Sequence, residues 1–163
     1  MRILAIDPGN TESGWCIIDA ATCKPLEFDK TPNADLGRWM RFGDMLDDVD
    51  MITIEMVAAY GMAVGADVFE TCVWIGRFVE SAYSFGNDCR LIKRQPVKLH
   101  HCHDSRAKDS NIRQALVDRF ALGQSNHGKG TKTEPGWFHG FAKDVWQAYA
   151  LAVYVADTTE GVQ

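Results

Sequence analysis

The feature that most constrains the fold is an apolar strand that ends on an acid. Residues Arg2–Ile6 read "RILAI", which is typical of a buried strand, but Asp7 follows directly and Pro-Gly then ends the run. By the two-residue period of a strand, Asp7 shares a face with Ile3 and Ala5. Because an unpartnered carboxylate is costly among core residues, Asp7 must be ion-paired, hydrogen-bonded or bound to a metal.

A second strand repeats this pattern, and a later helix adds a third acid. Met51–Met56 reads "MITIEM" and carries Glu55, and Asp144 stands near the start of an alanine-rich helix predicted over Phe141–Ala156. If the two strands are neighbours, their acids meet at the edge where open α/β sheets bind ligands. Close carboxylates repel unless a cation separates them, and oxygen-only ligands favour Mg²⁺ or Mn²⁺. Taken singly, each acid also suits a helix cap or a surface charge.

The remaining pattern predicts a mixed α/β fold. Three strands joined by short turns come first, and helix, strand, helix, strand and helix follow. The further predicted strands are Gly14–Asp19, Lys24–Phe28 and Arg90–Lys93, and the further helices are Asp35–Leu46, Asp67–Ser84 and Ala107–Phe120. We therefore expect one domain, 1–163, with a three-strand antiparallel meander and two parallel strands flanked by helices. This order matches the ribonuclease-H-like topology, in which the first and fourth strands are adjacent at the centre of the sheet.

Composition excludes several classes of protein. Hydrophobic residues make up 46% and charged residues 24% of the 163 positions, which is ordinary for a globular domain. No apolar run is long enough for a membrane span, and the N-terminus lacks the apolar region of a signal peptide. The five cysteines are scattered and form no CxxC motif, so no disulfide framework is indicated. We expect a cytoplasmic protein.

Charge is unevenly distributed along the chain. The whole sequence carries −5, yet seven basic residues face only two aspartates between positions 90 and 113. Screening limits the reach of distant charges to about 8–10 Å, so a local basic cluster can bind phosphates even on an acidic protein. A solvated charged face is the alternative interpretation. The basic residues are Arg90, Lys93, Arg94, Lys98, Arg106, Lys108 and Arg113.

Three motifs together resemble a known family. The segments "IDPGNTESGW", "ITIEMV" and "KDVWQAYALA", in this order, are similar to those of the RuvC-type Holliday junction resolvases, and the small size resembles a phage-encoded member. The resemblance implies a Mg²⁺-dependent endonuclease, with Mn²⁺ able to substitute, that hydrolyses phosphodiesters in four-way junctions and other branched DNA. It implies paired nicks made by a homodimer, in DNA recombination or repair.

The resemblance also implies roles for individual residues. Asp7, Glu55 and Asp144 would bind the divalent ions, and Lys98 would act at the scissile phosphate. The family shows a second ligand three residues after the acid of the last helix, where this chain has Gln147, a weaker neutral ligand. His139 and Lys143 lie near this helix start but out of register, and we expect His139 to be a loop histidine.

DNA contacts and the dimer are implied in the same way. An aromatic residue that probes the junction centre would be Tyr60, although it lies two positions beyond the expected site, and it could equally anchor its loop. The apolar helix Asp67–Ser84 would form the dimer interface or, alternatively, serve only the core. The expected DNA-binding residues are Tyr60, Lys93, Arg94, Lys98, Arg106, Lys108 and Arg113.

Two other functions remain open from the sequence. A non-catalytic binder of branched DNA with the same fold would explain Gln147 as a lost ligand. A phosphate-binding ATPase-like domain is suggested by "DPGNT", which resembles the phosphate loop of that related fold. Such enzymes enclose the nucleotide between two lobes, and this chain is long enough for only one lobe. The ATPase-like interpretation is therefore the less favoured of the two.

Overall fold

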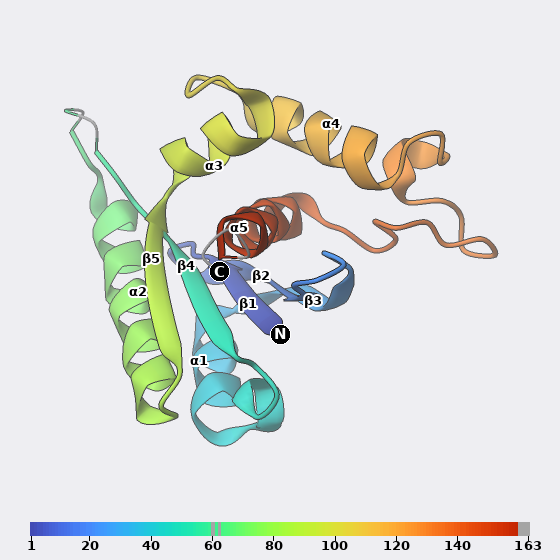
Figure 1. Cartoon of the computed structure of the whole chain (residues 1–163). Helices are drawn as coiled ribbons and strands as arrows, with labels where there is room; N and C mark the ends of the chain where they lie inside the picture. Colours follow the sequence, from blue (N-terminus) through green and yellow to red (C-terminus); the bar gives the residue numbers. More distant parts are fainter. Residues whose placement is uncertain (60, 62, 160–163) are drawn as a thin grey trace.

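A five-stranded mixed sheet forms the centre of the computed structural model, which describes residues 1–59, 61 and 63–159 (Figure 1). The strand order is β3-β2-β1-β4-β5. β1 pairs antiparallel with β2 and parallel with β4, β2 pairs antiparallel with β3, and β4 pairs parallel with β5. The predicted sheet is therefore confirmed. The strands are β1 Arg2–Asp7, β2 Glu12–Asp19, β3 Pro25–Pro32, β4 Met51–Met56 and β5 Asp88–Lys93.

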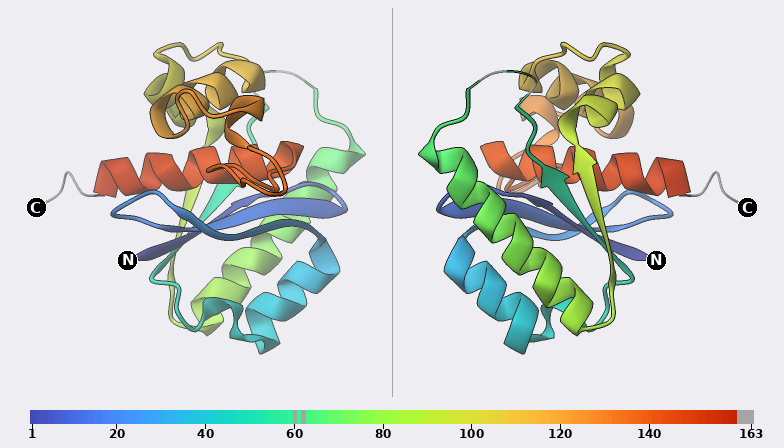
Figure 2. Two further views of the ribbon diagram at one scale, coloured as in Figure 1. Left: turned by 90° about the vertical axis from the view of Figure 1, so that its right-hand side faces the viewer. Right: turned by 90° about the vertical axis from the view of Figure 1, so that its left-hand side faces the viewer.

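Helices cover both faces of this sheet. In Figure 2, α5 lies along one face, α1 and α2 lie on the other, and α3 and α4 form a further layer beyond α5. Two short 3₁₀ turns, Asp44–Leu46 and Asn126–Gly128, occur in the connections. The α-helices are α1 Asn33–Phe42, α2 Ala66–Ser84, α3 Arg94–Cys102, α4 Asp109–Phe120 and α5 Lys143–Thr159. No helix among the described residues is both long and apolar enough to cross a bilayer.

The strand β1 separates two hydrophobic cores, as its alternation predicts. Ile3 and Ala5 belong to the core beneath α5, whereas Leu4 and Ile6 belong to the core beneath α1 and α2. All four side chains are fully buried. Most residues of α5 are buried, because the small alanines of this helix allow it to lie close against the sheet. Asp7 continues the α5-facing set and so points to the side where α5 begins.

One helix was not predicted from the sequence. The basic segment after β5 forms α3, in which Pro96 occupies the first turn, where a missing N–H costs little. His100 Nε2 lies 2.6 Å from a carboxylate oxygen of Asp157, and His101 Nε2 lies 2.8 Å from the carbonyl of Ala150. Burial lowers the pKa of His101 to about 4, so its ring is neutral. These histidines fasten α3 to α5.

Candidate active site

Asp7 and Glu55 are brought to the same level of the sheet by the pairing of β1 with β4. The last paired residues are Ile6 and Ile54, and the two acids follow directly on their strands. Parallel neighbouring strands are about 4.8 Å apart. The carboxyl ends of these two strands therefore present both acids at one edge, as the sequence predicted.

Asp144 reaches this edge because β2 has a glycine opposite Asp7. Gly14 pairs with Asp7, and a Cβ added to Gly14 would lie 2.6 Å from the backbone carbonyl of Asp144. Since real Cβ atoms do not approach so closely, only glycine lets the first turn of α5 pack against β2 here. The Ser-Gly of the first motif thus serves to admit Asp144 beside Asp7.

The edge is a crowded acidic environment. Burial, and next the charge of Glu55, raise the pKa of Asp7 from 3.8 to about 8, while Arg94 opposes this shift. Asp144 and Asp109 also raise it, so both lie within electrostatic reach of Asp7. Burial likewise raises the pKa of Glu55, although Arg94 lowers it in part. Cations are needed to keep this group of acids ionised.

Arg94 supplies one such cation at the end of β5. Its Nη1 donates to both carboxylate oxygens of Glu55 at 3.0 and 2.9 Å, and its Nη2 donates to Asp109 at 2.6 Å. Burial disfavours the charged guanidinium, but the two acids outweigh it and raise the pKa of Arg94. Arg94 was predicted to contact DNA, which stays a prediction; in the structure its guanidinium lies against Glu55 and Asp109.

Lys30 supplies a second cation from β3. Its Nζ lies 2.8 Å from Asp144 and 3.2 Å from Glu12, and these hydrogen bonds raise its pKa. Lys30 pairs with Gly14, which itself pairs with Asp7, so three strands align these residues. With their carboxylates turned toward Lys30 and Arg94, no three His, Cys, Asp or Glu side chains in the described part of the chain stand close enough to hold one ion together.

Lys30 and Asp109 were both missed in the sequence. Lys30 lies beyond the predicted edge strand Lys24–Phe28, in residues to which no element was assigned, whereas β3 continues to Pro32; only the strand register shows its position opposite Gly14. Asp109 counted merely as one of two acids in a basic segment. It begins α4, and the folding of α3 brings it within reach of Arg94. Neither residue has a local sequence signal.

The remaining predicted residues lie around this edge at different depths. Lys98 is half-buried on α3. Its charge lowers the pKa of Glu55, so Lys98 lies within electrostatic reach of the site. Arg106 lines a small pocket with Arg94 and Lys98, and the side chains of Lys93 and Lys108 are exposed. Tyr60 lies outside the described residues. Two more, Arg113 and Gln147, line a separate pocket together with Lys143.

His139 occupies the loop before α5. Its Nδ1 lies 3.2 Å from the carbonyl oxygen of Lys129, a residue of the same loop. The histidine is exposed. This contact agrees with the expectation of a loop histidine.

The donor set at the edge matches a hard divalent cation in chemistry. Its members are carboxylates, and the cations that now hold two of them, Arg94 and Lys30, are side chains that an ion could displace. Asp7 has a raised pKa because it is buried among other acids, which a nearby dication would reverse. The residue types at the edge therefore suit a hard divalent cation, although in this arrangement the carboxylates of the described residues do not gather around one point.

Comparison with known proteins shows the fold but no sequence relative. No family model matches the chain, and no curated protein sequence matches it. Among solved structures, the RuvC of Thermus thermophilus in complex with a Holliday junction substrate has a TM-score of 0.74 at 12% identity, covering 99% of this chain and 96% of that one. A second Thermus thermophilus RuvC structure has a TM-score of 0.71 at 14% identity, covering 99% and 97%. The chain thus has a RuvC-like, ribonuclease-H-like fold.

Proposed function

We propose that this protein is a divalent-metal-dependent endonuclease that cuts Holliday junctions and other branched DNA by paired nicks. The observation that carries the proposal is the convergence of Asp7, Glu55 and Asp144 at one sheet edge in a RuvC-like fold. One structural neighbour is described in complex with a Holliday junction substrate, which supports branched DNA as the substrate class. The sequence motifs point to the same activity independently.

In this proposal, Asp7, Glu55 and Asp144 hold Mg²⁺ or Mn²⁺, and Gln147 is a weaker ligand one helical turn from Asp144. The bound cation supplies an activated water and charge stabilisation for phosphodiester hydrolysis. Lys98, which already influences Glu55 electrostatically, stabilises the charge that develops on the phosphate. Arg94 and Lys30 occupy the carboxylates beforehand and release them when the ion binds.

DNA binding in this proposal uses the basic residues around the edge. Arg106 lines a small pocket with Lys98, Lys93 ends β5 beside the end of β4, and Lys108 precedes α4; Lys93, Arg106 and Lys108 are all exposed. Exposed lysines and arginines contact the sugar-phosphate backbone and position it without reading sequence. We therefore expect recognition of branched shape and phosphates.

A homodimer through α2 would place two such sites on opposed strands of a junction. The helix exposes an apolar stripe that the fold of one chain leaves uncovered: Phe69 is 62%, Val73 54% and Tyr83 60% exposed. Gly76, between them, has nothing within 4 Å of an added Cβ, so this part of the stripe is open. A two-fold dimer would bury this surface against its own copy.

Cleavage of a synthetic four-way junction tests the activity. We expect wild-type protein with Mg²⁺ to make symmetric nicks, and Asp7→Asn to lose at least about 10³-fold in rate, because several kcal/mol of charge stabilisation depend on the ion. A chelator should stop the wild-type reaction. Equal cutting by both proteins, or cutting without metal, would contradict the proposal.

Sedimentation tests the dimer. Phe69→Glu combined with Val73→Glu should convert a dimer to a monomer, whereas Leu122→Glu, a change at an even more exposed apolar residue just after α4, should leave it intact. A wild-type monomer under DNA-binding conditions would overturn this part of the proposal.

A non-catalytic binder of branched DNA is the second candidate. The observation in its favour is that Arg94 and Lys30 already neutralise Glu55 and Asp144, while the neutral Gln147 stands three residues after Asp144, where the family has its second ligand. This candidate predicts junction binding without Mg²⁺-dependent nicks and no functional change in Asp7→Asn. The same junction assay distinguishes the two.

A further inference from the structure

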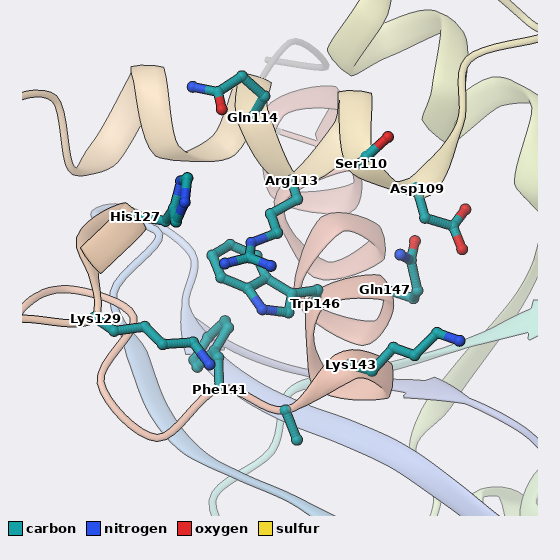
Figure 3. A pocket seen from close by; sticks show the side chains of 11 residues that line it. Asp109, Ser110, Arg113, Gln114, His127, Lys129, Phe141, Lys143, Trp146 and Gln147 are labelled. Atoms are coloured by element: carbon teal, nitrogen blue, oxygen red, sulfur yellow. The ribbon is translucent and has the colours of Figure 1, made fainter.

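A pocket beside the acidic edge has a different character. It is a cavity of about 450 Å³ between α4, the 121–142 loop and the start of α5. In Figure 3, Arg113 and His127 approach it from α4 and from the loop, and Lys129 reaches in from below. Asp109, Gln147 and Lys143 lie together at the right-hand end of the view. Asp109 lines this pocket and is joined to Glu55 by Arg94, so the pocket adjoins the candidate active site.

The charge of this pocket is unbalanced. Arg113, Lys129, Lys143 and His127 line it, and Asp109 is the one carboxylate in its lining. Asp109 is already bonded to Arg94, and no ion pair is found for the other four among the residues that the structure describes. A concave group of basic side chains, whose one acid is already paired with Arg94, is a site for an anion even in a chain of net charge −5.

The loop that carries Lys129 is held firmly. Phe138 N–H donates to the carbonyl of Gly128 at 2.8 Å, and Gly136 N–H donates to the carbonyl of Lys129 at 3.0 Å. Phe138 is fully buried, and Trp137 stacks on Phe120 with ring centroids 5.5 Å apart. The pocket wall is therefore built into the core and is not a loose surface segment.

The floor of the pocket combines an aromatic base with a polar group. Arg113 places its guanidinium 5.0 Å from the ring centroid of Trp146, which is itself buried, so the cation is fixed in place by packing. Gln147 is only 8% exposed, and no hydrogen bond of its amide appears among the described residues. A buried amide that faces a cavity is suited to an oxygen-rich ligand.

We propose that this pocket binds the phosphate of a single nucleotide in the DNA strand, next to the phosphodiester that is cut. The inference rests on the proposed function, because it places the cut strand across the acidic edge and continues it over Asp109 into the pocket. Pockets of about 300–1,000 Å³ hold small molecules, so a cavity of about 450 Å³ takes one nucleotide and not a duplex. Arg113 and Lys129 bind the phosphate, and Gln147 contacts the sugar-phosphate oxygens.

Two lysine variants of one loop test this site. Lys129 lines the pocket, whereas Lys132 lies in the same loop, is exposed and does not line it. The affinity of the full chain for a four-way junction is measured in chelator, so that no cutting occurs, at several salt concentrations. Lys129→Gln should weaken binding several-fold and reduce the salt slope by about 0.9, the value for one phosphate contact. Lys132→Gln should leave both unchanged, and thermal melting should show that both variants fold.

Ethylation interference locates the contact. With wild type and Lys132→Gln, ethylation of a phosphate beside the cleavage position should interfere with binding, and Lys129→Gln should lose that one signal. Identical footprints and slopes for the two variants, with wild type still cutting junctions, would overturn the pocket assignment alone. A wild type that neither binds nor cuts junctions would overturn the proposed function and the pocket with it.

A free nucleotide is the other source of the same phosphate chemistry. Thymidine monophosphate is therefore added to wild type and to Lys129→Gln in a thermal-shift measurement. No stabilisation of wild type, together with the footprint change, supports a site for a DNA strand. Stabilisation that requires Lys129, without any change in the junction footprint, would overturn the strand assignment.

Discussion

The acidic edge and the cationic pocket are neighbours with opposite charge, and they satisfy that charge differently. At the edge, the chain supplies its own counter-charges, since Arg94 holds Glu55 and Asp109, and Lys30 holds Asp144. In the pocket, four basic side chains line a cavity without acids of their own beyond Asp109. Glu55 and Asp144 at the edge thus have counter-charges from the chain itself, whereas the basic side chains of the pocket have no such partners among the described residues.

This difference indicates what each region binds. A cation that enters the edge must compete with an arginine and a lysine that are already present, so metal affinity depends on how easily these pairs open. An anion that enters the pocket competes only with water. A DNA strand could meet both conditions, with the cut phosphodiester at the metal-binding edge and a neighbouring phosphate in the cationic pocket. The following predictions test the contrast, from the largest expected effect to the smallest.

Asp144→Asn should have the largest effect. We expect at least about a 10³-fold loss of Mg²⁺-dependent junction cleavage, because the variant removes a charged ligand and several kcal/mol of charge stabilisation. Glu12→Gln is the matched control, since Glu12 binds the same Lys30. It should change the rate by less than about 10-fold, and a comparable loss in both variants would show that Lys30, not the ligand, matters.

The pH dependence of stability should depend on Asp7. Because folding raises its pKa from 3.8 to about 8, the metal-free folded state retains the proton more tightly than the unfolded chain. The contribution of Asp7 to the free energy of unfolding is therefore fully present below about pH 4 and falls as pH rises toward about 8, by up to about 1.4 kcal/mol per pH unit. Urea unfolding in chelator should show this fall in wild type and a smaller fall in Asp7→Asn, where the raised pKa of Glu55 still contributes.

Asp19 provides the opposite control for that measurement. Hydrogen bonds from Thr22 lower the pKa of this exposed carboxyl, so its contribution is present above the unfolded pKa and is lost as pH falls. Asp19→Asn should leave the decline between pH 4 and 8 in place. A decline of undiminished size in Asp7→Asn would show that Asp7 is not the main titrating group.

Arg94→Gln should destabilise the metal-free protein by about 2 kcal/mol. Breaking a buried ion pair costs about 3–5 kcal/mol, and we expect less here because the Arg94 and Glu55 side chains keep 25% and 15% exposure. Urea unfolding measures the change, and adding Mn²⁺ should restore more stability to the variant than to wild type. Arg38→Gln, which breaks an exposed pair with Asp35, should cost less than about 0.5 kcal/mol. Equal stability of Arg94→Gln and wild type would contradict the account of the edge.

Gln147→Glu should have the smallest effect, because Gln147 lies between the two regions. A carboxylate is a stronger ligand than an amide, so we expect about a 3–10-fold tighter Mn²⁺ affinity, measured by calorimetry. Gln114→Glu, at the opposite end of the same pocket, should leave Mn²⁺ affinity unchanged. Unchanged Mn²⁺ affinity in Gln147→Glu would assign Gln147 to the pocket alone.

Local patterns predicted most of the framework. Alternation in β1 correctly assigned Ile3 and Leu4 to opposite cores, and the order of elements correctly predicted β1 beside β4. The helix α3 was missed because Pro96 and two histidines are weak helix formers, and its position is set by contacts of His100 and His101 with α5. Tertiary contacts can override weak local preference.

The candidate site was predictable only where an acid interrupts an apolar strand or opens an apolar helix. Asp7, Glu55 and Asp144 carry that signal, since a charge beside core residues is costly unless it is paired, hydrogen-bonded or bound to a metal. Arg94 was noticed as a basic residue and assigned to DNA, because its charge is visible in the sequence but its partner is not. Lys30 and Asp109 lack any signal of their own, and strand register and helix docking place them.

The linear chain alone thus decided the kind of fold and the three acids that meet at its edge, because hydrophobic periodicity and the position of a charge within it are local properties. The tertiary structure decided which basic side chains form ion pairs with those acids and which basic side chains, among the described residues, have no acidic partner. Electrostatic partners are chosen by distance in space, and the approach of Asp144 to Gly14, of Arg94 to Glu55 and of Lys129 to Arg113 across the pocket follows from packing between elements far apart in the sequence.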